Sequence, residues 1–392
     1  MKRFLGFYAA ILSASLLAIP SASAIDPASA VNVFAKLAVA PELRNPSVSL
    51  IDLSTGKVVF ESNGDSQRKP ASLMKLLSAS ATVKYLDPEK VFATSISLGT
   101  ETNSIVIDGE LDPWMSTNSV VAERMHRTSL YGIASKGLRA AKKKSDGPLK
   151  KLQVYYNDIY SGEVAAIKAY YKKLGVTATF VKVSDTKAKS ISGDQIVYST
   201  SPTVNEIMIW FLLWSDNVIS ERMARIAAKA SGHEFSDKGV AKMFDKVLTE
   251  IGIDPSKIIV KDASGLSREN KVTANLLAQL LYKFHSDPAY AKVIEGLPIG
   301  GKTGTMRNRF VKTAPKAIGL VKAKTGTLTG TVSMAGYAQS GDREYAFVII
   351  ADELKGTRAA SAVARNSLDR YLAKIAAPLL TLNGETATTS TN

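Results

Sequence analysis

Two residues three positions apart, Ser72 and Lys75, could together cut an amide bond. Residues at this spacing lie on one face of a helix, so the hydroxyl and the amine would be within reach of each other. A lysine whose pKa is lowered by burial can act as the base for a serine nucleophile. The start of the helix would also supply backbone N–H groups for an oxyanion. We therefore predict Ser72 as the nucleophile and Lys75 as its base.

The Ser-x-x-Lys spacing is not specific by itself, because it occurs twice more, at Ser54/Lys57 and Ser184/Lys187. The first of these lies in a predicted hairpin turn, and the second lies in a polar stretch that no long apolar helix follows. In contrast, Pro70 introduces apolar residues at helical spacing, namely Leu73, Leu76, Leu77, Val83 and Leu86. Ser72 alone therefore stands at the head of a predicted buried helix.

A second candidate element is Ser215-Asp216-Asn217, which separates two helical patterns over 204–213 and 218–230. The Ser215 hydroxyl can relay a proton towards a leaving group, and the Asn217 amide can hold a substrate backbone. Ser-x-Asn also occurs at Ser116/Asn118, and a plain polar loop between helices is the alternative interpretation. We predict Ser215 as a catalytic residue and Asn217 as a substrate-binding residue.

The third element is Lys324-Thr325-Gly326-Thr327, just before a predicted hairpin with strands 332–338 and 345–351. An edge strand at this place can pair with an extended peptide, and its lysine and hydroxyls would face the carboxylate of that peptide. Lys-Thr-Gly-Thr also occurs at 302–305, but the residues after it do not resemble a strand. We therefore assign substrate binding to the segment that begins at Lys324.

The elements around these residues predict an α+β fold. Strands at 48–53 and 58–60 form a hairpin near the N-terminus, and a helix over 358–375 follows the C-terminal hairpin. One antiparallel sheet built from both termini and flanked by helices would hold the motifs. Residues 92–198 differ from the rest in composition and pattern. They contain lysine-rich helical segments and short predicted strands at 95–98, 104–107, 152–156 and 177–183. We interpret 92–198 as a smaller inserted α/β domain, and 25–91 plus 199–380 as the main domain.

The two ends of the sequence carry different signals. Lys2 and Arg3 precede an apolar stretch over 4–19, and Pro20-Ser-Ala-Ser-Ala24 supplies a small-residue cleavage site, as in a secretory signal peptide (1–24). The apolar run is shorter than the roughly 20 residues that a membrane helix needs. We expect an exported protein without a stable membrane span after cleavage. The short polar tail, 381–392, is predicted to be disordered.

Composition narrows the classes of function. The chain has no cysteine, so it can form no disulfide. It has only three histidines, which are far apart, so a zinc site or a Ser-His-Asp triad is disfavoured. We expect no metal and no organic cofactor. The net charge of +15 is diffuse, with one dense patch at 142–144 and 150–151. A solvated helix end is the favoured interpretation of this patch, and attraction to an anionic wall polymer is the alternative. No nucleic-acid motif is present, so nucleic acid is not expected as a partner.

Taken together, the three elements resemble the penicillin-binding, active-site-serine family, whose motifs are Ser-x-x-Lys, Ser-x-Asn and Lys-Thr-Gly. The sequence is more narrowly similar to the low-molecular-mass class C branch of D-alanyl-D-alanine carboxypeptidases and endopeptidases. The supporting segments are Pro70–Leu76, Ser215–Asn217, Asp262-Ala-Ser-Gly-Leu-Ser-Arg268, Lys322–Gly330, Ile107–Pro113 and Gly301–Phe310. Members of that branch usually carry a much larger insertion between their first two motifs, often with an extra small domain that is not expected in this chain.

The resemblance implies a DD-peptidase/β-lactamase-like fold and an acyl-enzyme on Ser72, with an oxyanion held by the N–H groups of Ser72 and Thr327. It implies peptidoglycan stem peptides as substrates and β-lactam antibiotics as covalent inhibitors. Arg268 would face a side-chain carboxylate of the substrate, with a plain surface arginine as the alternative. A β-lactamase is disfavoured because no Glu-x-x-Leu-Asn segment lies between Ser72 and Ser215. The intact motifs also argue against a catalytically silent wall-binding module.

Overall fold

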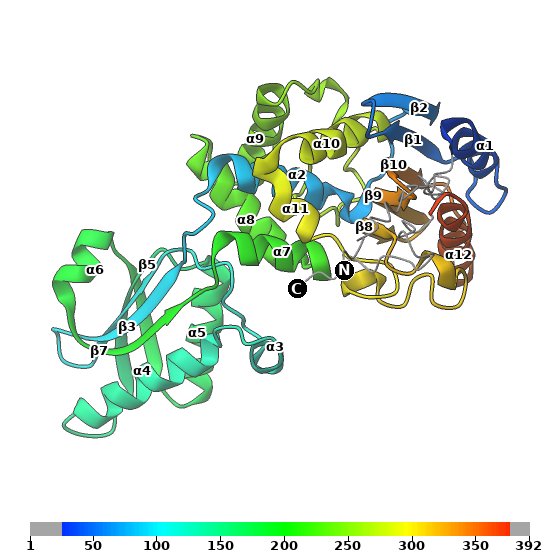
Figure 1. Cartoon of the computed structure of the whole chain (residues 1–392). Helices are drawn as coiled ribbons and strands as arrows, with labels where there is room; N and C mark the ends of the chain where they lie inside the picture. The colour runs from blue at the N-terminus through cyan, green and yellow to red at the C-terminus, as the bar shows by residue number, and fades with distance from the viewer. Residues whose placement is uncertain (1–25, 377–392) are drawn as a thin grey trace, which may run out of the picture.

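The chain folds into two lobes, each built around a five-stranded sheet (Figure 1). This computed structural model describes residues 26–376, so the predicted signal peptide (1–24) and the predicted tail (381–392) lie outside the described residues. Within 26–376, no helix is both long enough and apolar enough to cross a membrane.

The larger lobe contains the predicted sheet from both ends of the chain. Its strand order is β2-β1-β10-β9-β8, and all neighbours are antiparallel. The N-terminal strand β1 pairs with the C-terminal strand β10, with Ser47 opposite Ile350. The strands are β1 (Ser47–Asp52), β2 (Lys57–Ser62), β8 (Val321–Leu328), β9 (Thr331–Ser340) and β10 (Arg343–Ala351). Both predicted hairpins are therefore confirmed, and β8 forms one edge of the sheet.

Helices cover both faces of this sheet. Alternate residues of a strand point to opposite faces, so Phe347 and Ile349 of β10 pack on one side while Val348 and Ile350 pack on the other. One side is covered by α1 (Pro27–Ala38) and α12 (Arg358–Ile375), which lie side by side beyond the sheet in Figure 1. The helix predicted over 358–375 is thus confirmed.

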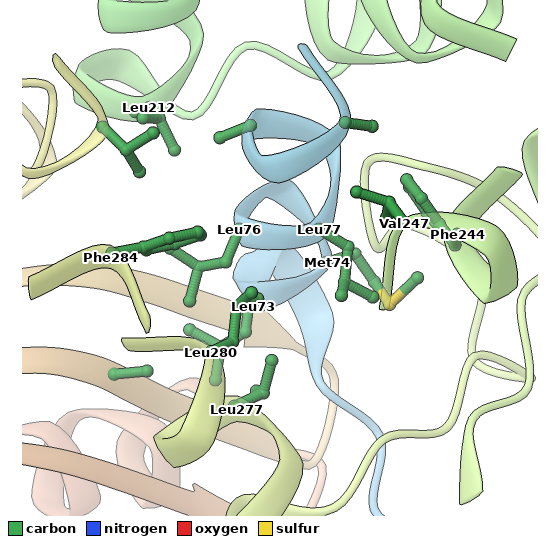
Figure 2. Packing of buried hydrophobic residues seen from close by; sticks show 14 of the residues in the cluster. Leu73, Met74, Leu76, Leu77, Leu212, Phe244, Val247, Leu277, Leu280 and Phe284 are labelled. Carbon is green, nitrogen blue, oxygen red and sulfur yellow. The ribbon is translucent and has the colours of Figure 1, made fainter. Parts of the chain in front are cut away.

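The other side of the sheet carries the helices that hold the motifs. They are α2 (Met74–Tyr85), α7 (Val204–Trp214), α8 (Asn217–Ala230), α9 (Asp237–Glu250), α10 (Ala274–Ser286) and α11 (Ala291–Glu295). Helix α2 is at the centre of this group and is buried on every side of its first turns. Figure 2 shows Leu76 and Met74 of α2 packing between α10 on one side and α9 on the other. Because the whole surface of this segment is packed, the turn that carries Ser72 is held rigidly.

The smaller lobe has the strand order β6-β5-β4-β3-β7. Strands β4, β5 and β6 run parallel, with helical crossovers, while β3 and β7 are antiparallel additions. The elements are β3 (Ala93–Gly99), β4 (Ser104–Gly109), α3 (Ser119–Arg124), α4 (Leu130–Lys144), β5 (Lys151–Asn157), α5 (Ser161–Lys173), β6 (Thr177–Lys182), α6 (Asp185–Ile191) and β7 (Ser192–Thr200). The four predicted strands are present, and β7 was not predicted. Because this lobe has its own apolar cluster, we propose that it forms a separate domain.

Charged side chains buried between the lobes fix the smaller one against α8. Arg222 of α8 pairs with Glu163 of α5 at 2.9 Å and stacks on Tyr160, with its guanidinium carbon 4.1 Å from the ring centre. Arg127 donates to the carbonyl of Trp114 at 2.8 Å and approaches Asp216 at 3.5 Å. These contacts tie the smaller lobe to the segment that carries Ser215.

Candidate active site

Ser72 lies in a tight turn just before α2. Residues Ala71–Leu73 form a 3₁₀ turn, and the α-helix begins at Met74, so Ser72 is one turn earlier than the sequence predicted. Ala71 has φ +50°, a left-handed conformation that is costly for a residue other than glycine. Strain of this kind persists where the surroundings determine the backbone, and it often marks functional sites.

Lys75 is completely buried, and its amine is within hydrogen-bonding distance of three oxygens. It lies 3.2 Å from Ser72 Oγ, 2.7 Å from Asn217 Oδ1 and 2.7 Å from the carbonyl oxygen of Ser264. Burial lowers the pKa of Lys75 to about 8, against the opposing pull of Glu221, Asp216 and Asp262. About a tenth of this amine is therefore neutral at pH 7, far more than for an ordinary lysine, and this fraction is able to accept a proton.

Ser215 and Asp216 are the two residues between α7 and α8. Ser215 ends α7 with φ +59°, and Asp216 then caps α8 by accepting the backbone N–H of Ile219 at 3.0 Å. The left-handed backbone turns the chain sharply and brings Asn217 to the Lys75 amine. Lys324 donates to Ser215 Oγ at 2.9 Å, so the second and third predicted motifs meet here. Burial, and then the nearby Lys75 charge, hold the pKa of Lys324 well below its usual range.

Strand β8 offers an open edge beside Ser72. Near the start of β8, the Val321 carbonyl accepts the N–H of Gly300, and the Ala323 N–H donates to the Pro298 carbonyl, each at 2.9 Å. Backbone groups of alternate residues point to the same side of a strand, so Thr325 and Thr327 present theirs on this same free side. At Gly326, a Cβ atom would lie 2.8 Å from the carbonyl oxygen of Pro70. Glycine at this position is what allows β8 to approach the Ser72 turn.

A cavity of about 410 Å³, which we call the main cleft, lies in front of these groups. Its walls include the predicted residues Ser72, Ser215, Thr325, Gly326 and Thr327. The 302–305 segment, rejected as a motif, still contributes Thr305, whose hydroxyl lies 2.9 Å from that of Thr325. Thr305 was not among the site residues predicted from the sequence.

Two arginines also line the main cleft, and neither was predicted. Arg309 is held by Asp369 of α12, with Nε 2.9 Å from Oδ1. Arg365 lies one helical turn before Asp369, and its guanidinium has no ion pair or hydrogen bond within residues 26–376. This wall of the main cleft therefore has two guanidinium groups, those of Arg309 and Arg365, and only one carboxylate, that of Asp369, beside them. The predicted Arg268 is exposed and is not among the residues that line the main cleft.

The loop from Asp262 to Arg268 completes the site from the other side. Asp262 accepts the backbone N–H of Gly265 at 2.6 Å, and Glu221 of α8 accepts that of Ser264 at 2.8 Å. Gly265 has φ +84°, and any Cβ there would collide with the carbonyl oxygen of Ala71. The loop therefore presents the Ser264 carbonyl to Lys75. The segment was predicted by resemblance, but Ser264 and Glu221 were not predicted to have a role.

Within residues 26–376, no group of three or more histidine, aspartate and glutamate side chains is placed to hold a metal ion. A serine beside a buried lysine, facing a sheet edge open to an extended peptide, places the protein among the serine hydrolases that act through an acyl-enzyme.

Comparison with known proteins defines the family. A profile of the D-Ala-D-Ala carboxypeptidase 3 (S13) family matches residues 30–144 and 145–375. The chain belongs to this family and is a serine-type D-Ala-D-Ala carboxypeptidase/endopeptidase of the low-molecular-mass class C penicillin-binding type.

Individual relatives agree with this assignment. Carboxypeptidase DacB of Mycolicibacterium smegmatis is 27% identical over 346 residues, which cover 76% of this chain and 75% of that protein. A D-alanyl-D-alanine carboxypeptidase of Actinomadura sp. is 34% identical over 157 residues, covering 38% of this chain and 29% of that protein. Penicillin binding protein 4 of Haemophilus influenzae has the same fold, with a TM-score of 0.67 and 16% identity over 87% of this chain and 98% of that one. The Haemophilus protein has also been solved in complex with a β-lactam.

Proposed function

We propose that this enzyme cleaves the D-alanyl-D-alanine end of peptidoglycan stem peptides, with Ser72 as the nucleophile and Lys75 as the base. The observation that carries the assignment is the position of the Lys75 amine, buried and 3.2 Å from Ser72 Oγ. In its neutral form this amine can keep two N–H bonds, to Asn217 and to the Ser264 carbonyl, and turn its lone pair to the Ser72 hydroxyl.

The reaction then proceeds in two steps. Lys75 takes the Ser72 proton while Ser72 Oγ attacks the peptide carbonyl, and the backbone N–H groups of Ser72 and Thr327 hold the oxyanion. Ser215 gives its proton to the departing amine, the C–N bond breaks, and an ester on Ser72 remains. Lys324, 2.9 Å from Ser215 Oγ, supports the negative charge that develops on this hydroxyl. Water then attacks the ester, and Ser72 is regenerated.

The edge strand and the arginines suit the carboxyl-terminal end of the substrate, which includes the departing D-alanine. The outward backbone groups of Thr325 and Thr327 can pair with the peptide as an added strand. Thr325 and the unpaired guanidinium of Arg365 are suited to a terminal carboxylate, with Arg309 adding positive charge to the same wall. We assign carboxylate recognition to this wall rather than to Arg268.

The same geometry supports reaction with β-lactams, because their amide occupies the position of the scissile peptide bond. The β-lactam complex of the Haemophilus relative supports this proposal. Peptidoglycan lies outside the cytoplasmic membrane, so we propose that the enzyme works in the extracytoplasmic envelope. The excess positive charge of the chain favours approach to an anionic wall.

Labelling with a fluorescent penicillin, followed by mass spectrometry of the intact protein and of Ser72→Ala, tests the assignment. We expect a long-lived adduct on the Ser72 peptide that is absent from the variant. Failure of the parent protein to form an adduct would exclude the catalytic assignment. Rapid steady-state turnover of a chromogenic cephalosporin would instead indicate a β-lactamase.

A further inference from the structure

The segment between β4 and α4, residues 110–129, joins the smaller lobe to the helices that carry the catalytic motifs, and the mechanism above gives it no role. Trp114 of this segment belongs to the apolar core of the larger lobe. It packs edge-on against Trp210 of α7, with ring centres 5.2 Å apart. The contact between the lobes is therefore packed like a protein interior, and side chains of the smaller lobe are fixed relative to α7 and α8.

Arg127 lies near the end of this segment, and all three nitrogens of its guanidinium have partners. Nε donates to the Trp114 carbonyl at 2.8 Å, and Nη2 donates to the Met115 carbonyl at 3.3 Å. Nη1 lies 3.5 Å from Oδ2 of Asp216. The side chain of Arg127 is 6% exposed and that of Asp216 is 19% exposed, so water screens this ion pair only weakly. Two carbonyls of its own segment thus orient Arg127 towards Asp216.

Asp216 separates Ser215 and Asn217, the two residues of this turn that the mechanism uses. One oxygen of its carboxylate, Oδ1, accepts the N–H of Ile219 at the start of α8, and the other, Oδ2, faces Arg127. Ser215 has φ +59°, a conformation that persists only where the surroundings impose it. Because both carboxylate oxygens are held, the turn keeps the Ser215 hydroxyl and the Asn217 amide in place.

Asp216 also acts on Lys75 through its charge. Burial lowers the pKa of Lys75, and Asp216 is, after Glu221, one of the carboxylates that oppose this effect. The positive charge of Arg127, beside Asp216, offsets part of the influence of that carboxylate. Without Arg127 the charge of Asp216 would be uncompensated, and the pKa of Lys75 would rise.

We propose that Arg127 is a positioning residue of the active site: by holding Asp216, it fixes the turn that carries Ser215 and Asn217. The smaller lobe then completes the catalytic centre of the larger lobe, in addition to being attached to it. The inference rests on the proposed function and adds to that same site a residue from the other lobe. It predicts that the loss of Arg127 changes both the rate of acylation and its dependence on pH.

The test measures the rate of penicillin acylation against pH in the full chain, with thermal unfolding of each variant as a check of folding. Arg127→Met removes the guanidinium, and Arg127→Lys keeps the charge but cannot bind both carbonyls as the planar guanidinium does. Arg222→Met is the matched control. Arg222 is also largely buried and joins the lobes, but it does so through Glu163 at 2.9 Å and the Met115 carbonyl at 3.0 Å, not through the turn.

We expect Arg127→Met to lower the plateau of the acylation rate at least about tenfold, because the turn is no longer held in the reactive geometry. The midpoint of the pH profile should also move to higher pH, whereas a purely structural loss would lower the plateau and leave the midpoint unchanged. Arg127→Lys should restore the midpoint and part of the rate. Arg222→Met should stay within about twofold of the parent. The other charged groups around Lys75, which these variants retain, are Glu221, Asp262 and Lys324.

A second pair of variants covers the case in which Arg127→Met does not fold, because a buried carboxylate without its partner destabilises a protein. Arg127→Met/Asp216→Asn leaves no unpaired charge, and it is compared with Asp216→Asn, whose amide oxygen can still accept from Arg127. The double variant should acylate at least about tenfold more slowly than Asp216→Asn. Its midpoint should not rise above that of the parent, because the charge of Asp216 is absent.

Three results would each overturn the inference: a plateau in Arg127→Met that equals the parent's, a midpoint that does not move, or an equal loss in Arg222→Met. If Arg127→Met does not fold, a double variant as fast as Asp216→Asn would overturn it. A parent that penicillin does not acylate would instead overturn the proposed function.

Discussion

Glu221 accepts the backbone N–H of Ser264 at 2.8 Å, and the carbonyl oxygen of Ser264 accepts the Lys75 amine at 2.7 Å. A carboxylate on α8 thus positions the carbonyl that binds the Lys75 amine. The same carboxylate acts on the base through its charge, since Glu221 is the strongest of the groups that raise the pKa of Lys75 against the effect of burial. Glu221 therefore both positions the carbonyl that binds Lys75 and raises the pKa of the Lys75 amine.

The pH dependence of acylation follows from this lysine. In the mechanism that we propose, its neutral form is the active base, and burial lowers the pKa of Lys75 to about 8. The rate of acylation by a penicillin should rise about tenfold per pH unit below this value and level off above it. Stopped-flow acylation between about pH 5 and pH 10 measures the profile. A rate that falls as pH rises through 8 would contradict the assignment of Lys75 as base.

Glu221→Gln should move this profile to lower pH. Glutamine keeps an oxygen that can accept the N–H groups of Ala263 and Ser264, while the negative charge that raises the pKa of Lys75 is lost. The midpoint of the acylation profile should therefore fall below that of the parent. Glu295→Gln, on α11 and paired with Lys292, is the control and should leave the midpoint unchanged. An upward shift in Glu221→Gln would contradict the role that we assign.

Lys75→Met should separate stability from activity. The pKa of Lys75 is about 8 in the folded protein and 10.5 in the unfolded chain. Below pH 8, burial of the charged amine therefore lowers the stability of the parent. As pH rises from 8 to 10.5, the folded state loses this proton first, and the parent becomes more stable. The stability of Lys75→Met relative to the parent should thus decrease over that window, by up to about 3 kcal/mol. Urea unfolding at the two ends of the window measures it, and acylation should be lost throughout. Identical pH dependence in both proteins would show that the amine is not desolvated.

Gly265→Ala should be severely destabilising. It combines a positive φ with a Cβ that would collide with the carbonyl oxygen of Ala71, next to Ser72. Gly252→Ala is the matched control, because Gly252 has a similar φ of +79° and nothing within 4 Å of a Cβ. We expect the control to lose about 1 kcal/mol and Gly265→Ala to lose at least about 3 kcal/mol, together with most penicillin acylation. Equal losses would mean that the close approach does not matter.

Asp112, buried between the lobes, should give a second pH effect. Burial raises its pKa to about 7 from 3.8, so the folded state binds the proton more tightly, and stability is lost as pH rises through this window. Asp112→Asn cannot ionise, and its stability relative to the parent should increase from pH 4 to pH 8 by up to about 4 kcal/mol. Thermal unfolding at both pH values provides the measurement. If Asp112→Asn changed the stability by the same amount at both pH values, the result would show that Asp112 stays ionised in the folded protein.

Much of the larger lobe could be predicted from local patterns. The strands of the two terminal hairpins show either a clear alternation of apolar and polar residues or a continuous apolar run. The last helix begins and ends at the residues that the sequence indicated. Sequence context also separated the segment at Lys324 from the similar one at Lys302, because only the former enters a strand. Strand β7 was missed, since most of its residues are exposed at a sheet edge and give no apolar signal.

The tertiary parts of the site could not be predicted. Arg309 and Arg365 reach the main cleft because α12 packs against the 304–310 segment, and nothing local to either residue indicates this contact. Arg268, in contrast, was selected by resemblance alone and lies exposed. Glu221 resembles any surface glutamate of an amphipathic helix until the 262–268 loop is placed beside it. The residues that position the base are therefore visible only in the folded chain.

The pairing of β1 with β10 has a consequence for the newly made chain. Ser72 and Lys75 are synthesised early, yet Lys324 and the sheet edge beside Ser72 depend on strands that end at Ala351. Contacts between such distant segments form late in folding. A ribosome-released fragment that lacks the final strands would carry the nucleophile and its base but have no site. Reactivity towards penicillin is therefore a direct report that the chain has been synthesised at least as far as Ala351 and that its sheet has folded.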